Sequence, residues 1–407
     1  KIKEGNKRGI IWHTQGSGKT ALAYYNVKHL QDYFQKENTI PKFYFIVDRL
    51  DLLKQAKTEF INRGLSVNIV NSKQEFVSDI KKASALHNSS GNNEITVVNI
   101  QKFSEESSSE DINDYDINIQ RVYFLDEVHR SYNPKGSFLA NLNESDRNAI
   151  KIGLTGTPLL GTDYNSKSLF GAYIHKYYYN SSIADGCTLR LIREEIETNY
   201  RLALKQTLEE IDILKGNADK KLVYAHPKFV EPMLDYIVQD FEKARITMND
   251  NTIGGMVVCD SSEQAKMLYE IFQTKYAEQK NGTEGLLMAA EPKQSYGDNK
   301  KNESRVTKAA VILHDIGTKD DRKNEVDQFK DGHIDLLFVY NMLLTGFDAP
   351  RLKKLYIGRV IKAHNLLQTL TRVNRTYKDF RYGYVVDFAD IVFLAVKPQF
   401  LEGVLDE

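Results

Sequence analysis

A glycine-rich turn near the start of the chain restricts its fold more than any other feature. The segment His13-Thr-Gln-Gly-Ser-Gly-Lys-Thr20 lies between an apolar run at 8–14 and a stretch with helical spacing at 19–36. Its two glycines allow backbone N–H groups to point inward around a phosphate, and the N-terminus of the following helix adds positive potential. Lys19 would reach the β- and γ-phosphates of a nucleotide, and Thr20 would bind Mg²⁺.

The turn departs at one position from the standard pattern G-x-x-x-x-G-K-[ST], because His13 stands where that pattern has its first glycine. The remaining G-x-G-K-T lies in the strand–turn–helix context that phosphate binding requires. The residues predicted to bind the nucleotide are consecutive: Gln15, Gly16, Ser17, Gly18, Lys19 and Thr20.

Apolar runs alternate with helical stretches in both halves of the chain. Further strands are expected in the first half at 43–47, 67–70, 95–100, 122–125 and 150–154, with a helix at 50–62, and in the second half at 222–225, 255–259, 334–340, 354–357 and 383–386, with a helix at 262–276. This alternation predicts an α/β fold in which a mostly parallel sheet is covered by helices on both faces. Ligands of such sheets bind at the carboxyl ends of the strands.

The length of 407 residues predicts two domains, because single cores stop growing at about 250–300 residues. The expected division is a first domain at 1–180, a helical connector at 181–220, a second domain at 221–395 with a polar insertion at 278–306, and the start of a missing C-terminal region at 396–407.

Composition excludes several classes of protein. No apolar run reaches the roughly 18–20 residues of a membrane-spanning helix, and the first residues carry no signal-peptide pattern. Two cysteines, Cys187 and Cys259, form neither a disulfide framework nor a zinc site, so a reducing cytoplasm is expected. Equal numbers of basic and acidic residues, 55 each, argue against a uniformly basic nucleic-acid binder but permit a local basic groove.

Two carboxylates follow the apolar run at 122–125. Asp126 is predicted to hold Mg²⁺ and Glu127 to orient and activate an attacking water. A glutamate directly after the aspartate favours hydrolysis over phosphoryl transfer to another substrate. His129 lacks partners at metal-ligand spacing, so we expect it to relay between the nucleotide and the next motif rather than to bind zinc.

That next motif is Leu154-Thr-Gly-Thr-Pro158, at the end of another expected strand. The hydroxyls of Thr155 and Thr157 could couple the state of the nucleotide to the position of the second domain. The segment could equally be only a tight turn.

The second half carries its own motif cluster. Leu344-Thr-Gly346-Phe-Asp348-Ala-Pro350 is followed by Gln368-Thr-Leu-Thr-Arg372-Val-Asn-Arg375 on an expected helix. Two arginines three positions apart would share one helix face. Such a guanidinium suits the charge of a γ-phosphate in the transition state. The alternative interpretation is a solvated basic helix face.

Taken in order, these blocks resemble the motor of superfamily 2 helicases and translocases, which has two RecA-like domains. The resemblance spans residues 9–388, and it narrows to the R subunit of type I restriction enzymes. The segments that carry it are Trp12-His-Thr-Gln-Gly-Ser-Gly-Lys-Thr20, Ile100-Gln-Lys-Phe103, Asp126-Glu-Val-His-Arg130, Gly153-Leu-Thr-Gly-Thr-Pro158, Thr345-Gly-Phe-Asp-Ala-Pro350 and 368–375. That family commonly has Trp-His in its phosphate loop.

The resemblance implies an ATP- and Mg²⁺-dependent motor that pulls double-stranded DNA, with ATP hydrolysed at the interface of two RecA-like domains. In that family Gly346 and Asp348 correspond to nucleotide-binding positions, Gln368 to a coupling position, and Arg372 and Arg375 to catalytic positions. The nuclease domain would lie outside this chain, in a parent protein that is a type I site-specific deoxyribonuclease. The implied partners are the modification and specificity subunits. The implied location is the cytoplasm, and no membrane is an expected partner.

The resemblance also places contacts to the DNA backbone. The matching positions are Arg49, Asn99, Gln101, Lys102 and Ser261. Arg49 and Lys102 are the strongest electrostatic candidates, although lone basic residues are mostly solvated surface. Asn99 stands where the family more often has threonine.

Three other functions remain open at this point. The first is a strand-separating DNA or RNA helicase of the same superfamily. The second is a nucleotide-binding scaffold without hydrolysis, which the intact Lys19, Asp126, Glu127 and Arg375 disfavour. The third is a small-molecule kinase, which would not need the second motif cluster.

Overall fold

The protein is described by a computed structural model in which the chain divides into two compact units, Lys1–Thr188 and Leu189–Glu407. The residues it describes are 2–81, 87, 91–99, 119–127, 142, 146, 148–156, 170–215, 224–277, 306–361, 363–388 and 405–406. None of the described helices combines the length and apolar character that crossing a bilayer requires.

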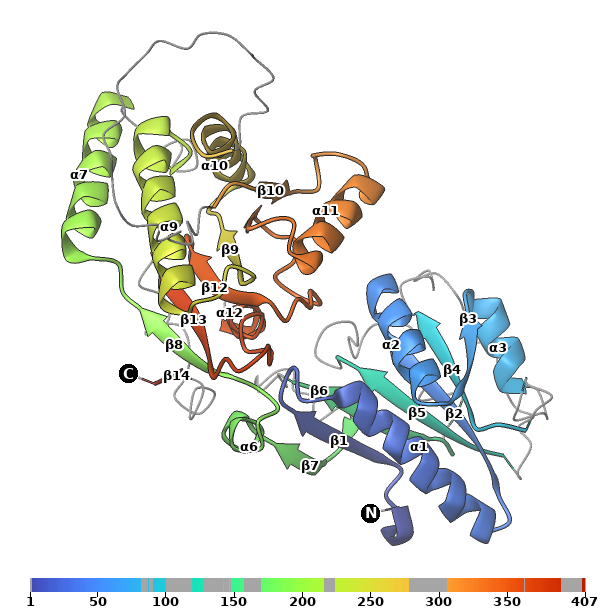
Figure 1. Ribbon diagram of the computed structural model, residues 1–407. Helices are drawn as coiled ribbons and strands as arrows, with labels where there is room; N and C mark the ends of the chain where they lie inside the picture. Colours follow the sequence, from blue (N-terminus) through green and yellow to red (C-terminus); the bar gives the residue numbers. More distant parts are fainter. Residues whose placement is uncertain are drawn as a thin grey trace, which may run out of the picture. The chain divides into compact units, whose positions relative to one another are not determined.

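The first unit is a seven-stranded sheet with the strand order β3-β4-β2-β5-β6-β1-β7 (Figure 1). All of its strand pairs are parallel. In chain order its elements are β1 (Arg8–His13), α1 (Lys19–Lys36), β2 (Ile40–Val47), α2 (Leu50–Asn62), β3 (Ser66–Val70), α3 (Lys73–Lys81), β4 (Glu94–Asn99), β5 (Ile119–Asp126), β6 (Ile150–Thr155), β7 (Tyr173–Tyr177) and α6 (Tyr179–Ala184), after a short 3-10 turn at Ile2–Glu4.

Helices cover both faces of this sheet. Apolar residues of α1, such as Val27 and Leu30, pack with Phe60 of α2 onto one face. Phe76 and Ile80 of α3 pack onto the other face. The central strands are buried on both sides, which explains why they are continuous apolar runs rather than alternating patterns.

The second unit repeats this architecture with the strand order β10-β11-β9-β12-β13-β8-β14, again with parallel pairs. Its elements are β8 (Arg190–Glu194), α7 (Thr198–Lys215), α9 (Pro227–Thr247), β9 (Gly254–Val258), α10 (Ser262–Lys275), β10 (Ala309–Ile312), α11 (Lys319–Asp331), β11 (Leu336–Val339), β12 (Leu352–Ile357), α12 (Ala363–Leu370), β13 (Tyr382–Asp387) and β14 (Leu405–Asp406).

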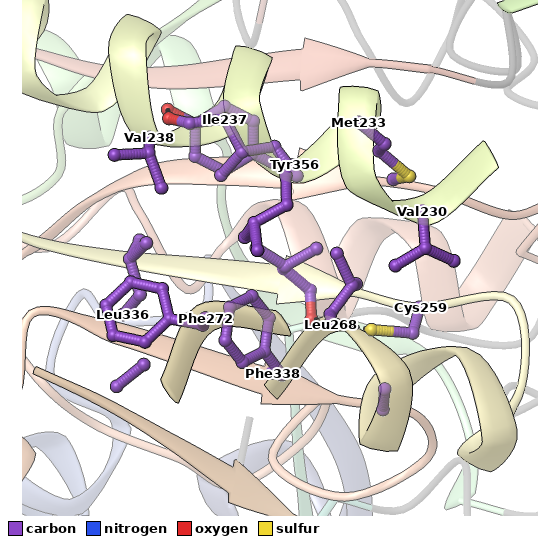
Figure 2. Close-up of a cluster of buried hydrophobic side chains, with 14 of the residues drawn as sticks. Val230, Met233, Ile237, Val238, Cys259, Leu268, Phe272, Leu336, Phe338 and Tyr356 are labelled. Atoms are coloured by element: carbon purple, nitrogen blue, oxygen red, sulfur yellow. Dashed lines mark hydrogen bonds between the residues drawn. The ribbon is translucent and has the colours of Figure 1, made fainter. Parts of the chain in front are cut away.

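The main core of the second unit lies between this sheet and two helices. Figure 2 shows Met233 and Ile237 of α9 near Tyr356 of β12, and Phe272 of α10 beside Phe338 of β11. All five side chains are almost completely buried. On the other side of the sheet, the Phe329 ring of α11 lies so close to β9 that only glycine fits there: a Cβ at Gly254 would be 2.5 Å from the ring.

Most of the expected helices and strands are confirmed, but the structure corrects three predictions. The predicted helical connector at 181–220 is wrong for Arg190–Glu194, which forms β8 between β13 and β14. The structure also separates the units after Thr188. Most of the predicted insertion at 278–306, residues 222 and 223 of the expected strand at 222–225, and residues 396–404 lie outside the described residues. The described half of that expected strand, Tyr224 and Ala225, does not form a strand.

Candidate nucleotide site

The glycine-rich turn links β1 to α1 as the sequence predicts. Gly16 and Gly18 have φ angles of 91° and 90°, in the left-handed region where a side chain would be strained. The Ser17 amide donates to the Thr14 carbonyl at 3.1 Å, which closes the turn. Helix α1 begins at Lys19, so its first amides are available for an anion.

The edge strand β7 and the end of β6 support this turn. The Thr14 amide and hydroxyl both donate to the Tyr177 carbonyl at 3.0 Å. On the other side, a Cβ added at Gly156 would lie 3.1 Å from the backbone nitrogen of Gln15. Glycine at this position therefore allows the segment after β6 to approach the phosphate-binding turn closely.

The acidic pair lies at the carboxyl end of β5 and reaches the same turn. Lys19 Nζ is 2.5 Å from Glu127 Oε1. Their side chains are only 11% and 14% exposed, so water screens the ion pair weakly. Glu127 itself has a φ of 51°, a backbone conformation that is uncommon for a residue with a side chain. The sequence predicted that both residues would face the nucleotide but not that they pair with each other.

Asp126 is a buried carboxylate next to this pair. Burial raises the pKa of Asp126 to about 7; the Lys19 charge opposes the rise, and the charges of Glu127 and Asp48 add to it. Asp126 Oδ1 has no hydrogen-bond partner among the residues that the structure describes. A desolvated oxygen without a donor is the kind of ligand that Mg²⁺ favours, so this residue fits the predicted metal role. Asp48 is a further acidic neighbour, which was not among the residues predicted for this site.

The coupling residues are only partly described. Thr155 ends β6 beside β1, opposite Trp12, and its side chain is fully buried. Trp12 Nε1 donates to the carbonyl of Gly156 at 3.2 Å, which ties the two strand ends together. His129 and Thr157 lie outside the described residues, so their predicted roles stay predictions.

In the second unit the structure separates the two arginines. Helix α12 ends at Leu370, so Arg372 and Arg375 follow the helix and do not share a helix face as predicted. The Arg372 side chain is 2% exposed. Its guanidinium donates to the carbonyl of Gln368 at 2.9 Å and to the carbonyl of Phe347, which fixes the loop before β12 to the end of α12.

Arg375 is the more accessible of the two. Its Nε donates to Asp348 Oδ1 at 2.8 Å, and the two side chains are 16% and 42% exposed. Gly346, with a φ of 74°, makes the turn that presents Asp348. Lys353 of β12 donates to the carbonyl of Arg375 and so holds its backbone in place. Gln368, predicted to couple, is buried within this unit.

The predicted DNA contacts have different surroundings. Arg49 precedes α2 and is partly exposed. Asn99 ends β4 and is buried. Ser261 is 1% exposed and accepts the Gln264 amide as the N-cap of α10, so its hydroxyl is occupied by the helix. Gln101 and Lys102 lie outside the described residues.

A family model of SWI2/SNF2 ATPases matches residues 1–221, more than half of the chain. The chain belongs to the SWI2/SNF2 ATPase family. This membership confirms the predicted class of enzyme, one that hydrolyses ATP. A second model, type I restriction enzyme subunit R domain 3, matches residues 251–390. The matches of this SWI2/SNF2 ATPase thus cover both units.

Proteins similar to this chain are named as type I restriction enzyme subunits. The chain is 26% identical over 415 residues to the type I restriction enzyme SauMRSORF196P endonuclease subunit of Staphylococcus aureus (strain MRSA252), covering 95% of this chain and 42% of that protein. It is 28% identical to the putative type I restriction enzyme MjaIXP endonuclease subunit of Methanocaldococcus jannaschii, covering 95% and 36%. This SWI2/SNF2 ATPase chain therefore spans less than half the length of these relatives.

Two solved structures share the fold. One is the fragment structure of a putative HsdR subunit of a type I restriction enzyme from Vibrio vulnificus YJ016, with a TM-score of 0.59, 15% identity, and coverage of 100% of this chain and 65% of that one. The other is the type ISP restriction-modification enzyme LlaBIII bound to DNA, with a TM-score of 0.60, 12% identity, and coverage of 98% and 27%. The predicted resemblance to type I R subunits and the predicted pair of RecA-like α/β domains are confirmed.

Proposed function

We propose that this chain is the ATP-driven motor of a type I restriction enzyme R subunit, which moves double-stranded DNA past the enzyme before cleavage by a nuclease domain elsewhere in the parent protein. The observation that carries the proposal is the cluster of Lys19, Asp126 and Glu127 at the carboxyl end of the first sheet. It joins a phosphate-binding cation, a metal ligand and a base, which are the groups that nucleotide hydrolysis requires.

In this proposal the turn from Gln15 to Thr20 holds the phosphates through its backbone amides. Thr20 and Asp126 would hold Mg²⁺, which when bound neutralises charge on the β- and γ-phosphate oxygens. Ionised Asp126 is needed for this role, and the nearby Lys19 charge favours ionisation.

Lys19 and Glu127 would exchange partners when the nucleotide binds. Without a nucleotide, each neutralises the other at 2.5 Å. Phosphate oxygens offer Lys19 stronger charge, and the glutamate that it releases can then accept a proton from the attacking water. Nucleotide binding would in this way free the base for catalysis.

Arg375 is our proposed contact of the second unit with the transferred phosphoryl group. Its side chain is partly exposed, and its present partner Asp348 is an exposed carboxylate from which it can be displaced. Arg372 is not proposed for this role, because two backbone carbonyls occupy its buried guanidinium. Gly346 and Gln368 would shape the segments that carry these side chains.

The proposal that the protein moves along DNA rests on the family resemblance and on fewer residues than the proposed nucleotide site. Arg49 and Lys102 are the proposed contacts to DNA phosphates, with Asn99 and Gln101 beside them; we leave Ser261 out because its hydroxyl caps a helix. Sequence recognition would come from the specificity subunit, which acts with the modification subunit. A DNA substrate of this kind implies a cytoplasmic protein.

Displacement of a third DNA strand tests this function. The complete subunit is assembled with its partners, and ATP is added to linear duplex carrying a triplex downstream of the recognition site. Release of the third strand without separation of the duplex, lost in Lys19→Ala, is the expected result. ATP consumption with duplex unwinding and no release would identify a helicase instead. ATP binding without DNA-stimulated turnover would favour a nucleotide-binding scaffold.

A further inference from the structure

The histidine in the phosphate-binding turn has a defined set of contacts that the nucleotide site described so far does not use. His13 is 9% exposed, and its ring stacks on Tyr177 of β7 with centroids 4.6 Å apart. Its Nδ1 is 2.5 Å from the hydroxyl oxygen of Ser17. The same hydroxyl oxygen is 2.5 Å from the carbonyl oxygen of Thr14. His13 thus connects the edge strand to the middle of the turn.

These two short contacts determine where the hydrogens lie. A carbonyl oxygen only accepts, so the single hydroxyl hydrogen of Ser17 must be directed at Thr14. The contact between Ser17 and His13 therefore needs a hydrogen on Nδ1 of the imidazole. Hydrogen-bond networks assign histidine tautomers in this way. His13 is consequently a donor at Nδ1, and the lone pair of a neutral ring lies at Nε2.

The surroundings of the ring favour the neutral form. Burial, together with smaller contributions from the nearby His175 and Lys19, lowers the pKa of the His13 imidazole to about 4. A neutral ring has one N–H group, and the Ser17 hydroxyl uses it. A neutral histidine also adds no positive charge that would compete with Lys19 for phosphate.

We propose that His13 is a positioning residue that holds the phosphate-binding turn in its binding shape before a nucleotide arrives, by donating from Nδ1 to Ser17 while stacked on Tyr177. The inference rests on the proposed nucleotide-binding function. A glycine at this position, as in the standard pattern, would leave the turn without this connection to β7. The nucleotide would then have to order the turn as it binds, and this cost would weaken binding. His13 does not touch the phosphates in this proposal; it acts through Ser17.

Two substitutions in the full chain separate the hydrogen bond from simple filling of space. In His13→Asn the side-chain amide can place an N–H near the position of Nδ1, whereas His13→Leu fills the site without a donor. We expect His13→Leu to raise the dissociation constant for ATP about tenfold, with a smaller change in turnover, and His13→Asn to raise it less than about threefold. His29→Leu, at an exposed histidine of α1, is the matched control.

The tautomer is measured directly by nitrogen NMR of the imidazoles, with the His13 signal assigned by its loss in His13→Asn. A neutral ring protonated at Nδ1 between pH 6 and 8 is the expected result. A ring protonated at Nε2, equal weakening in the Asn and Leu variants, or unchanged affinity in His13→Leu would overturn the inference. The proposed function fails separately, if the wild-type chain does not bind ATP or if Lys19→Ala binds it equally well.

Discussion

Replacing Glu127 with glutamine should make the protein bind ATP more tightly while it loses turnover. The substitution preserves the size of the side chain and a hydrogen-bond acceptor but removes its negative charge. In the structure that charge is the partner of Lys19 at 2.5 Å. Two properties that usually move together, affinity and activity, should therefore move in opposite directions.

The size of the gain in affinity follows from the burial of the pair. A hydrogen bond between charged groups contributes about 1.5–3 kcal/mol, and one with a neutral partner about 0.5–1.5 kcal/mol. Side chains that are only 11% and 14% exposed place this pair among the less screened cases. ATP must break the contact in both proteins, so Glu127→Gln saves about 1–1.5 kcal/mol, which corresponds to a dissociation constant lower by a factor of about 5–13.

Turnover should fall much further than affinity rises. Glutamine cannot accept the proton of the attacking water, and loss of a general base costs roughly 10²–10⁴ in rate. Affinity is measured by fluorescence anisotropy of a labelled ATP with Mg²⁺, and turnover by phosphate release. Glu59→Gln is the matched control. Glu59 pairs with Arg63 on the surface of α2, and the two side chains are 37% and 34% exposed.

Either of two results would contradict this reasoning. Weaker ATP binding by Glu127→Gln, with an unchanged unfolding transition, would mean that the pair with Lys19 does not compete with phosphate. Undiminished hydrolysis would remove Glu127 from its role as base. If Glu59→Gln showed the same changes, the effect would be one of overall charge rather than of this site.

Three further predictions follow from the same structure. Arg375→Ala should reduce turnover about 10³-fold and leave ATP affinity within about threefold, as steady-state kinetics would show. Arg372→Ala should instead lower the free energy of unfolding by roughly 1–3 kcal/mol in urea titration, because buried carbonyls lose their donor. ATP affinity in Mg²⁺ should rise with pH through about 7, the raised pKa of Asp126, because only the ionised carboxylate binds the metal, and a flat binding profile between pH 6 and 8 would contradict this. Gly383→Ala would place a Cβ 2.0 Å from the carbonyl oxygen of Val373, so the second unit should lose at least about 1–3 kcal/mol of stability in chemical denaturation.

The phosphate-binding turn could be predicted because its requirements are local. Left-handed glycines, a lysine and a helix start occupy successive positions, and the structure places Gly16, Gly18 and Lys19 as the pattern requires. The ion pair between Lys19 and Glu127 joins residues far apart in the chain. It depends on the order of strands in the sheet, which the sequence does not display.

The arginine pair shows where periodicity misleads. Continuing a helix through residues 368–375 put Arg372 and Arg375 on one face, but the backbone tightens before it reaches them. The amides of Arg372 and Val373 donate three residues back, to Thr369 and Leu370, as at many helix ends. One arginine then points into the unit and the other toward Asp348.

Strand β8 was missed because its stability comes from neighbours. Its sequence Arg-Leu-Ile-Arg-Glu has too few apolar residues to indicate a buried strand. Glu194 pairs with Lys354 of β12 at 2.7 Å, and Arg193 lies 3.6 Å from Asp387 of β13. Partners from later in the chain compensate these charges, so a segment that looks like a solvated helix on its own can join the sheet.

The two catalytic cations proposed here share one arrangement. Lys19 is paired with Glu127 inside the first unit, and Arg375 with Asp348 inside the second. A partly buried cation without a partner would cost several kcal/mol, so each unit needs an internal anion to fold with its cation in place. The phosphates of ATP carry enough negative charge to replace Glu127 as the partner of Lys19. Nucleotide binding would therefore release the carboxylate that is the proposed base. We infer that the readiness of the site to hydrolyse ATP depends on ATP itself, because the nucleotide must displace Glu127 from Lys19 before Glu127 can act on water.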